Sequence, residues 1–319
     1  MPVPDDYLAY PHRAYGADQA RYPWRLSIDR APIAWPAEAA VATMIVVPLE
    51  FHMLDPKGAP FKHPGAMVTP YPDLRHFTTR DYGNRVGVFR ILTELKRAGL
   101  KATFPINAVL LPRIRPVIDA LLKDGHEIAA YGWDTDHIHW SGQEAGVERR
   151  WVEETRAAFE GIGLCPRTWM SPARQQSFET MDLIAAAGFD ICLDWEQDSV
   201  PTPMKTAGRD VIGAPLSTEL DDRVLLSDRR QTEAEWAEQI LEAVRFMAKE
   251  GPRFGGQVLG FSLTPYISGQ PFRIWALRKV MAQLAQDAAV WSATASEIVE
   301  AWLAASARVQ GEALCNRVD

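Results

Sequence analysis

Cysteine is scarce in this chain, which contains Cys165, Cys192 and Cys315 at widely separated positions. An odd number of scattered cysteines provides neither a disulfide framework nor the paired thiolates of a zinc knuckle. We therefore expect reduced thiols, as in the cytoplasm. Histidine is absent after His139, so chemistry that depends on an imidazole has to come from the first half of the chain.

Long apolar runs and an excess of positive charge are also missing. No apolar run approaches the ~20 residues that cross a bilayer, and the amino terminus lacks the basic and then apolar pattern of a signal peptide. The net charge of -7 argues against a surface for nucleic acid. The sequence predicts a cytoplasmic protein that acts on a small-molecule substrate, with no nucleic-acid partner and no membrane partner.

The composition indicates one large domain with an arm in front of it. With 319 residues, of which 47% are hydrophobic, the chain can bury a large core. Residues 1–38 are rich in aromatic residues, proline and charge but show little periodicity. We expect 1–38 to be an N-terminal arm and 39–319 a single domain. The arm would pack over this domain or cross to a neighbouring subunit, which predicts a homo-oligomer.

Strand-like and helix-like segments alternate from residue 40 onward. Residues 40–47 form an apolar run between two prolines, as in a buried parallel strand, and a proline-rich loop is expected over 51–80. Further strands are predicted at 102–106, 127–131, 167–170, 190–193 and 257–263, and helices at 84–98, 112–123, 144–160, 177–187, 233–250, 272–285 and 296–305. About seven such units with short connections indicate an α/β fold with a parallel sheet and favour a barrel over an open sheet.

Reactive groups of such barrels lie at the carboxyl ends of the strands. The sequence places polar and aromatic side chains directly after the predicted strands. These candidates are Glu50, His52, Asn107, Tyr131 to His139, Ser171 to Arg174, Asp194 to Asp198, Pro215 to Glu219, and Thr264 to Tyr266.

One strand end carries a known type of motif. Residues 125–137 read Gly-His-Glu-Ile-Ala-Ala-Tyr-Gly-Trp-Asp-Thr-Asp-His and resemble the second motif of the polysaccharide deacetylase (NodB-homology) superfamily. The resemblance implies a distorted (β/α)7-type barrel in which a His-x-x-x-His pair holds a divalent cation. Here these two positions are Tyr131 and Thr135, and a phenol or a hydroxyl is a poor ligand for zinc. We therefore expect no metal cofactor at the family's usual site.

Three segments are similar to the allantoinase-like branch of this superfamily, which acts on a small cyclic ureide. They are Asp81 to Arg90, Gly125 to Trp133, and Leu263 to Arg273, and the last contains an uninterrupted Ser-Gly-Gln-Pro-Phe-Arg. The glycines and prolines in them are also suited to turns and helix starts. Three such segments in the family's order favour the resemblance.

The other family motifs are matched in part. The first, an acidic pair that supplies a base and a metal-binding carboxylate, falls on Leu49 and Glu50, so one carboxylate remains. The third and fourth imply site roles for Arg174 and Asp194. As alternatives, Glu50 would be the salt-bridge partner of an arginine, and Arg174 and Asp194 would form a structural ion pair. In the fifth motif the general-acid histidine is replaced by Thr264, whose hydroxyl cannot do the work of imidazole in acid–base catalysis.

Two arrangements remain open for the site. The first is a displaced zinc site built from Asp134, Asp136, His137 and His139 together with Glu50 and His52. Its alternative, which we favour, is a polar loop with an exposed histidine pair. The second arrangement is free of metal.

In the metal-free arrangement Glu50 is the base or positions the water, and Arg174 and Asn107 polarise a carbonyl. Burial among the rings of Tyr131, Trp133, Trp169 and Trp195 raises the pKa of Glu50 to suit a general base. The predicted catalytic residues are Glu50, Arg174 and Asp194. The predicted substrate-binding residues are Asn107, Tyr131, Trp133, Asp134, His137, Trp195 and Thr264. The aromatic members of this set would equally serve as core.

The sequence favours a hydrolase of carbon–nitrogen bonds other than peptide bonds. Its substrate would be a small amide, imide or ureide, and no metal would be needed. Two alternatives stay open. One is a metal-dependent N-deacetylase of an amino sugar or polysaccharide, and the other is a descendant of the family that binds a small molecule without hydrolysing it.

Overall fold

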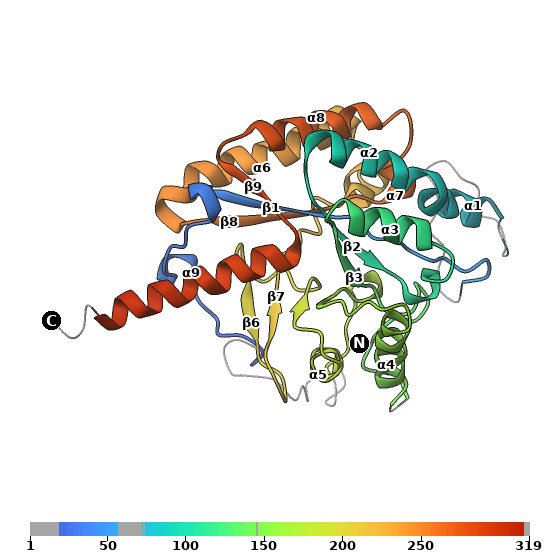
Figure 1. Cartoon of the computed structure of the whole chain (residues 1–319), viewed down its shortest axis with the longest axis horizontal. Helices are drawn as coiled ribbons and strands as arrows, with labels where there is room; N and C mark the ends of the chain where they lie inside the picture. The colour runs from blue at the N-terminus through green and yellow to red at the C-terminus, as the bar shows by residue number, and fades with distance from the viewer. Residues whose placement is uncertain (1–18, 57–71, 73, 145, 316–319) are drawn as a thin grey trace, which may run out of the picture.

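A computed structural model of the chain describes residues 19–56, 72, 74–144 and 146–315, and its centre is a curled sheet with helices on the outside (Figure 1). The strand order is β6-β7-β5-β4-β3-β2-β1-β8, and β9 also pairs with β1. The strands are β1 (Val41–Val46), β2 (Thr103–Ile106), β3 (Glu127–Ala130), β4 (Thr168–Trp169), β5 (Ile191–Cys192), β6 (Thr202–Met204), β7 (Val211–Gly213), β8 (Gln257–Ser262) and β9 (Val290–Ser292).

The helices lie mainly between consecutive strands. They are α1 (Leu74–Tyr82), α2 (Val88–Ala98), α3 (Arg115–Lys123), α4 (Val147–Glu160), α5 (Thr180–Ala186), α6 (Glu233–Phe254), α7 (Pro265–Ser268), α8 (Ile274–Gln286) and α9 (Ala295–Cys315). Two π-helical turns, η4 (Gly83–Gly87) and η7 (Arg223–Asp228), and several 3-10 turns complete the set. Among the described residues, none of the helices has both the length and the apolar character that a membrane span needs.

The two ends of the sheet meet at β8, which gives the sheet the form of a distorted barrel. Backbone hydrogen bonds from Val258 N to Ser199 O at 2.7 Å and from Ser217 N to Gly260 O at 3.0 Å join β8 to the segments around β6 and β7. Glycine is required at position 260, because a Cβ atom there would lie 2.4 Å from the carbonyl oxygen of Pro215. The predicted α/β fold, a distorted barrel with a mostly parallel sheet, is confirmed.

Alternation along β1 builds the core on both faces of the sheet. All six residues of β1 are buried, and successive side chains of a strand point to opposite faces. Val41 and Ile45 pack with the surrounding helices, whereas Ala42, Met44 and Val46 belong to a second apolar cluster with side chains of β5 and β8. Strand β1 therefore contributes to the inside and the outside of the barrel, as its continuous apolar run predicts.

Several parts of the sequence fold differently from the expectation, and β9 and α7 fall where no element was predicted. Strands β6 and β7 form an antiparallel hairpin that was not predicted, because each has three residues and β6 contains Pro203. Residues 74–80, expected to be loop, belong to α1. The five prolines of the expected loop all precede residue 73, and proline before a helix does not interrupt it.

The described part of the predicted arm, residues 19–38, lies against the barrel. Arg21 is buried and donates to both carboxylate oxygens of Asp182, at 2.8 and 2.7 Å. Trp35 is also buried, and its Nε1 donates to the carbonyl oxygen of Gln257 at 3.0 Å. Residues 1–18 lie outside the described residues, and a crossing of the arm to a second subunit stays a prediction.

Candidate active site

Glu50 follows β1 at the carboxyl end of the barrel, where two asparagines hold the backbone. Asn84 donates from Nδ2 to the carbonyl oxygen of Glu50 at 2.7 Å. Asn107, directly after β2, accepts from the backbone N–H of Phe51 at 2.8 Å and donates to the carbonyl oxygen of Tyr131. Asn107 is fully buried. It therefore ties the ends of the first three strands together beneath Glu50.

The carboxylate of Glu50 has three polar partners. Arg223 Nη2 lies 2.7 Å from Oε2, the hydroxyl of Tyr131 donates to Oε1 at 3.1 Å, and His52 Nε2 lies 3.3 Å from Oε2. The side chains of Glu50, His52 and Arg223 are 5%, 17% and 31% exposed. A guanidinium, an imidazole and a phenol thus converge on one shielded carboxylate, and two of these groups remain open to solvent.

The charge balance at Glu50 differs from the expectation. Burial raises the pKa of this carboxyl, as predicted, but the charges and hydrogen bonds of Arg223 and His52 outweigh burial. The pKa of Glu50 therefore lies well below its ordinary value of 4.5. The prediction of a raised pKa was wrong because it included the aromatic surroundings and not the arginine. The ion pair with Arg223 therefore favours the ionised form of Glu50.

Arg223 was not predicted from the sequence, although it is the main partner of Glu50. It begins the π-helical turn η7, and its backbone N–H donates to Asp221 Oδ1 at 2.7 Å. Single π turns occur frequently at functional sites. A signal was available in the run Asp221-Asp222-Arg223, which places three charges directly before the apolar Val-Leu-Leu.

Asp222 is completely buried beside Thr264. Its Oδ2 accepts from the backbone N–H of Thr264 at 2.8 Å and from the hydroxyl of Ser268, while its Oδ1 and the Thr264 hydroxyl have no hydrogen-bond partner in the protein. Burial and the charge of Asp221 raise the pKa of Asp222 to about 7. Thr264, which the sequence resemblance pairs with the general-acid histidine, therefore lies next to a carboxyl whose pKa is about 7.

Close contacts between glycines bring two of the three allantoinase-like segments together. A Cβ atom at Gly87 would lie 2.0 Å from the carbonyl oxygen of Pro265, and one at Gly269 would lie 2.5 Å from the Cα of Gly87. Arg90 Nη1 adds a hydrogen bond of 2.8 Å to the carbonyl oxygen of Gly269. These contacts place η4 against α7, and α7 carries Tyr266 to the side of Arg223, whose guanidinium carbon lies 5.9 Å from the ring centre.

Arg174 lies on a strained turn after β4. Ala173 and Arg174 both have left-handed backbone conformations, with φ of 55° and 54°. Such conformations cost of order 1–3 kcal/mol each in a residue with a side chain and persist where the surroundings impose them. Arg174 Nη1 donates to the Thr218 hydroxyl at 2.9 Å, and Nη2 donates to the carbonyl oxygens of Leu216 at 2.7 Å and Asp194 at 3.3 Å. The side chain is thus held by oxygens of the loop after β7.

Asp194 holds the loop after β4 and forms no ion pair with Arg174. Its Oδ1 accepts from the backbone N–H of Ser171 at 2.8 Å, and its Oδ2 accepts from Gln176 Nε2 at 2.6 Å. Arg174 contacts only the backbone carbonyl oxygen of Asp194. The suggested structural ion pair of Arg174 with Asp194 was wrong, and the arginine that pairs with Glu50 is Arg223. Proximity along the sequence to a strand end could not distinguish these arginines.

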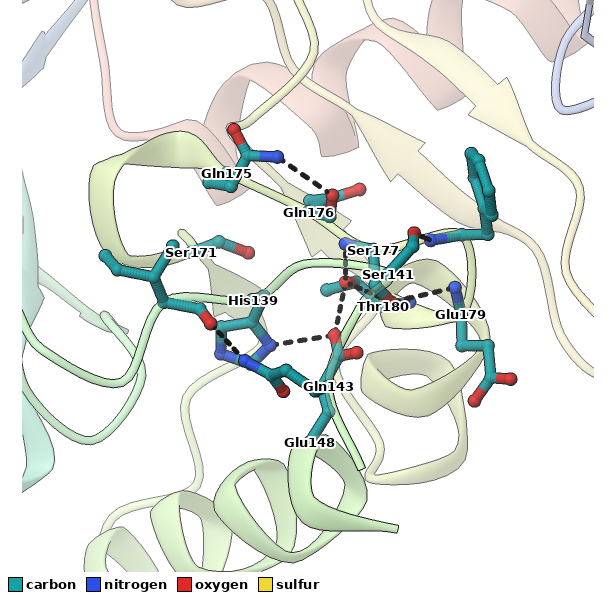
Figure 2. Close-up of polar contacts among 12 residues, drawn as sticks. His139, Ser141, Gln143, Glu148, Ser171, Gln175, Gln176, Ser177, Glu179 and Thr180 are labelled. Carbon is teal, nitrogen blue, oxygen red and sulfur yellow. Dashed lines mark hydrogen bonds and ion pairs between the residues drawn. The ribbon is translucent and has the colours of Figure 1, made fainter. Parts of the chain in front are cut away.

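The segment after β3 is held by two carboxylates. Asp134 is buried, and its Oδ1 accepts from the backbone N–H of Asp136 at 2.8 Å and lies 2.5 Å from His137 Nδ1. His139 Nδ1 lies 2.8 Å from Glu148 Oε1, and Figure 2 shows the imidazole directed at this carboxylate. His139 is completely buried, so the expected exposed histidine pair was wrong. The two carboxylates fold this polar segment back on the barrel.

The two predicted tryptophans follow different strands and have different neighbours. Trp133 follows β3, is partly buried and packs on the core. Trp195 follows β5, and its Nε1 donates to Gln176 Oε1 at 2.8 Å. The ring of Trp195 also meets the edge of Tyr22 from the arm, with ring centres 6.1 Å apart. The structure therefore brings Glu50 and Tyr131 together with Arg223, and it keeps Asp194 and Trp195 in a neighbouring loop network.

Solved structures share this arrangement of strands. A probable polysaccharide deacetylase from Pseudomonas aeruginosa PAO1 is similar with a TM-score of 0.77 and 23% sequence identity, over 88% of this chain and 98% of that chain. The Puue allantoinase is similar with a TM-score of 0.78 and 23% identity, over 89% and 98%. The chain has the polysaccharide deacetylase fold. No protein-family profile and no curated protein sequence matches it. The predicted resemblance is confirmed at the level of the fold.

Tyr131 and Thr135, the two positions that the sequence resemblance pairs with metal-binding histidines, have other partners and do not fit a metal ion. Tyr131 donates to Glu50, and burial raises the pKa of its phenol well above 10.0. Thr135 donates its hydroxyl hydrogen to the carbonyl oxygen of Phe51 at 2.8 Å. The guanidinium of Arg223 already neutralises Glu50 and would repel a second cation.

The displaced zinc site is not formed either. His137 and His139 are directed to separate carboxylates, Asp134 and Glu148. Within the ranges that the structure describes, no group of three or more His, Cys, Asp or Glu side chains is arranged to hold a metal ion. A zinc site with protein ligands needs at least three such groups. The interpretation based on alternate residues of an extended segment failed because the two imidazoles are directed to different carboxylates.

Proposed function

We propose that the chain hydrolyses a carbon–nitrogen bond, other than a peptide bond, in a small amide, imide or ureide without a metal ion. The observation that carries this proposal is the 2.7 Å ion pair of Arg223 with Glu50 at the carboxyl end of the barrel, where enzymes with such barrels react their substrates. The fold is shared with proteins named as an allantoinase and a polysaccharide deacetylase, which supports the reaction class.

Glu50 is better suited to orient its neighbours than to accept a proton. A carboxylate whose pKa is far below neutral is a weak base, and catalytic bases work best when their pKa lies near the working pH. We therefore assign the role of base to His52. Its Nε2 lies 3.3 Å from Glu50, whereas its Nδ1 lies 3.5 Å from the Thr135 hydroxyl. The Thr135 hydroxyl gives its hydrogen to the carbonyl oxygen of Phe51 and so does not donate to Nδ1. In this proposal Nδ1 is therefore the nitrogen that accepts a hydrogen bond from water.

In the proposed reaction, water attacks the carbonyl carbon and passes a proton to Nδ1 of His52. Glu50 stabilises the imidazolium, as the carboxylate of a hydrolytic triad does. Arg223 donates to the carbonyl oxygen as it gains negative charge. When the carbon–nitrogen bond breaks, His52 returns the proton to the leaving nitrogen. This transfer takes the place of the acid that Thr264 cannot supply.

The remaining candidate residues take supporting roles in this proposal. Arg174 faces the substrate from the strained turn, and Asp194 positions that turn through the Ser171 backbone. The proposed walls of the substrate site are the side chains of Tyr131, Trp133 and Thr264. The residues proposed to hold the surrounding loops in place are Asn107, Asp134, His137 and Trp195.

The experiment is a hydrolysis assay on hydantoins, ureido acids and N-acyl amides with and without a chelator. We expect turnover and folding stability to be unchanged by the chelator, and zinc content to be well under one equivalent. Because a general base contributes a factor of roughly 100 to 10,000, His52→Gln should lower kcat by that factor. The control is His126→Asn at the opposite end of the barrel, which keeps an acceptor for the Ala102 N–H and should leave kcat unchanged. Turnover that is lost on chelation and returns with zinc would contradict this mechanism.

A small-molecule binding protein is the second candidate function. It is favoured by the saturation of Glu50, whose two oxygens are already occupied by Arg223 and Tyr131. In that case ureides would raise the melting temperature with no product formed. The third alternative, a metal-dependent deacetylase of an amino sugar, receives no support from Tyr131 and Thr135.

A further inference from the structure

The protein is acidic, with a net charge of -7, yet arginines gather around the mouth of its barrel. Burial raises the pKa of Asp221, and the charges of Arg223 and Arg174 oppose that rise. Burial also raises the pKa of Tyr266, to about 12, and the charges of Arg223 and Arg80 oppose it. Arg223 contacts Glu50 directly, and Arg174 and Arg80 are near enough for their charges to act on Asp221 and Tyr266.

Some N–H groups of Arg223 and Arg174 have no hydrogen-bond acceptor at the barrel mouth. Arg223 gives Nη2 to Glu50, and Arg174 gives Nη1 and Nη2 to oxygens of the loop after β7. The Nε atoms of both side chains are buried and have no hydrogen-bond acceptor in the protein. Buried polar groups in proteins are nearly always paired. The Nε–H groups of Arg174 and Arg223 therefore have no acceptor in the protein and could donate to a bound ligand.

The side chain of Arg174 makes more hydrogen bonds than that of Arg223. Its backbone is left-handed with φ of 54°, and its guanidinium is fixed by the Thr218 hydroxyl and the Leu216 carbonyl oxygen. These hydrogen-bond partners are neutral, and the nearby carboxyl of Asp221 forms no hydrogen bond with Arg174 within the described residues. A guanidinium held in place by neutral groups is suited to receive a carboxylate from outside the protein.

We propose that the substrate carries a carboxylate, which Arg174 receives while the scissile bond lies at His52 and Arg223. The inference rests on the proposed function, because it names the class of amide or ureide that the site accepts. The substrate class is then a ureido acid, an N-acyl amino acid or a cyclic imide with a carboxylate side group.

The experiment compares the binding of N-carbamoylglycine with that of its neutral counterpart N-carbamoylglycinamide, by calorimetry on the full chain. Because a charge-assisted hydrogen bond is about twice as strong as a neutral one, we expect the acid to bind about ten-fold or more tightly than the amide. The difference should shrink at high salt, which screens charge. Equal binding of the two compounds, or stronger competition by inorganic phosphate than by the acid, would overturn the inference.

Variants locate the effect at one residue. Arg174→Gln should remove most of the preference for the acid, and Arg174→Lys, which keeps the charge, should retain part of it. The matched control is Arg245→Gln on the outer surface of α6, where Arg245 pairs with Glu242, and this change should leave the preference intact. A preference that survives in Arg174→Gln would exclude the assigned site. Hydrolysis of both compounds without preference overturns this inference alone, whereas tight binding of the acid without hydrolysis overturns the proposed function alone.

Discussion

The barrel has a shielded glutamate at each end, and the two have opposite electrostatic properties. At the carboxyl ends of the strands, Glu50 pairs with Arg223 and its pKa is lowered. At the amino ends, Glu127 begins β3 and its pKa is raised, chiefly by burial. The donors to Glu127 are Thr103 Oγ1 at 2.9 Å, Thr168 Oγ1 at 2.5 Å and Ser296 N at 3.1 Å. Burial raises the pKa of both glutamates. The direction of the net pKa shift is therefore decided by the charged or neutral groups that contact each carboxyl.

The difference separates the end of the barrel that carries the candidate site from the opposite end, which supports the scaffold. Two threonine hydroxyls and one backbone N–H donate to Glu127 and so link β2, β3, β4 and the start of α9. These links require that the Glu127 oxygens accept hydrogen bonds, and they do not require a negative charge. An arginine holds Glu50 as an anion, which in turn holds His52. The motif at residues 125–137 spans both ends. Its Gly-His-Glu part stabilises the scaffold, and its Tyr131 and Thr135 reach the candidate site.

The largest expected effect is that of Glu50→Gln on stability. The change keeps the shape but leaves the Arg223 guanidinium without its carboxylate, and breaking a buried pair in this way costs roughly 3–5 kcal/mol. Because the Arg223 side chain is 31% exposed, solvent offsets part of the loss, and we expect a decrease of about 3 kcal/mol in the free energy of unfolding. Urea unfolding at neutral pH measures it.

A double-mutant control tests whether this loss of stability comes from the ion pair of Glu50 with Arg223. In the background of Arg223→Met no guanidinium is stranded, so Glu50→Gln should cost less than about 1 kcal/mol. If the cost is the same in both backgrounds, the pair is not coupled, and the contrast between the two ends of the barrel loses its physical basis.

Much of the fold could be predicted because its signals are local. The apolar run that becomes β1 and the glycines that end the helices are read directly from the sequence, and these elements fix the order of the barrel. The β6–β7 hairpin has no such signal, since its strands have three residues each and pair only across the sheet edge. The closure at Gly260 also depends on a long-range contact with Pro215.

The candidate site was predictable in part for the same reason. Glu50 and Tyr131 follow regular strands, so the rule of strand ends locates them. Arg223 lies ten residues beyond β7 in an irregular segment, and its distance to Glu50 is set by tertiary structure alone. The sign of the Glu50 pKa shift could therefore not be deduced before its partner was known.

The second prediction uses pH to sharpen the contrast. The pKa of Glu50 is lower in the folded chain than its ordinary value of 4.5, so its charge stabilises the fold above about pH 4.5. That stabilisation is lost as the pH falls below 4.5 toward the folded pKa. The difference in free energy of unfolding between the native chain and Glu50→Gln should therefore be largest at neutral pH and shrink on acidification. A difference that stays constant as the solution is acidified would contradict the assigned charge.

The smallest expected effect is that of Glu127→Gln at the other end. Because the folded pKa of Glu127 is raised above 4.5, ionisation disfavours the fold as the pH rises from 4.5 through the folded pKa. The amide avoids this cost, its oxygen can accept from the Ser296 N–H, and the hydroxyls of Thr103 and Thr168 can rotate to suit its N–H groups. We expect a change at neutral pH between zero and a gain of about 1 kcal/mol, and the gain should fade on acidification. Urea unfolding of Glu127→Gln beside Glu50→Gln then gives two pH dependences of opposite sign. A loss of about 3 kcal/mol in Glu127→Gln, of the size expected for a broken buried pair, would mean that both ends of the barrel depend on a buried charge.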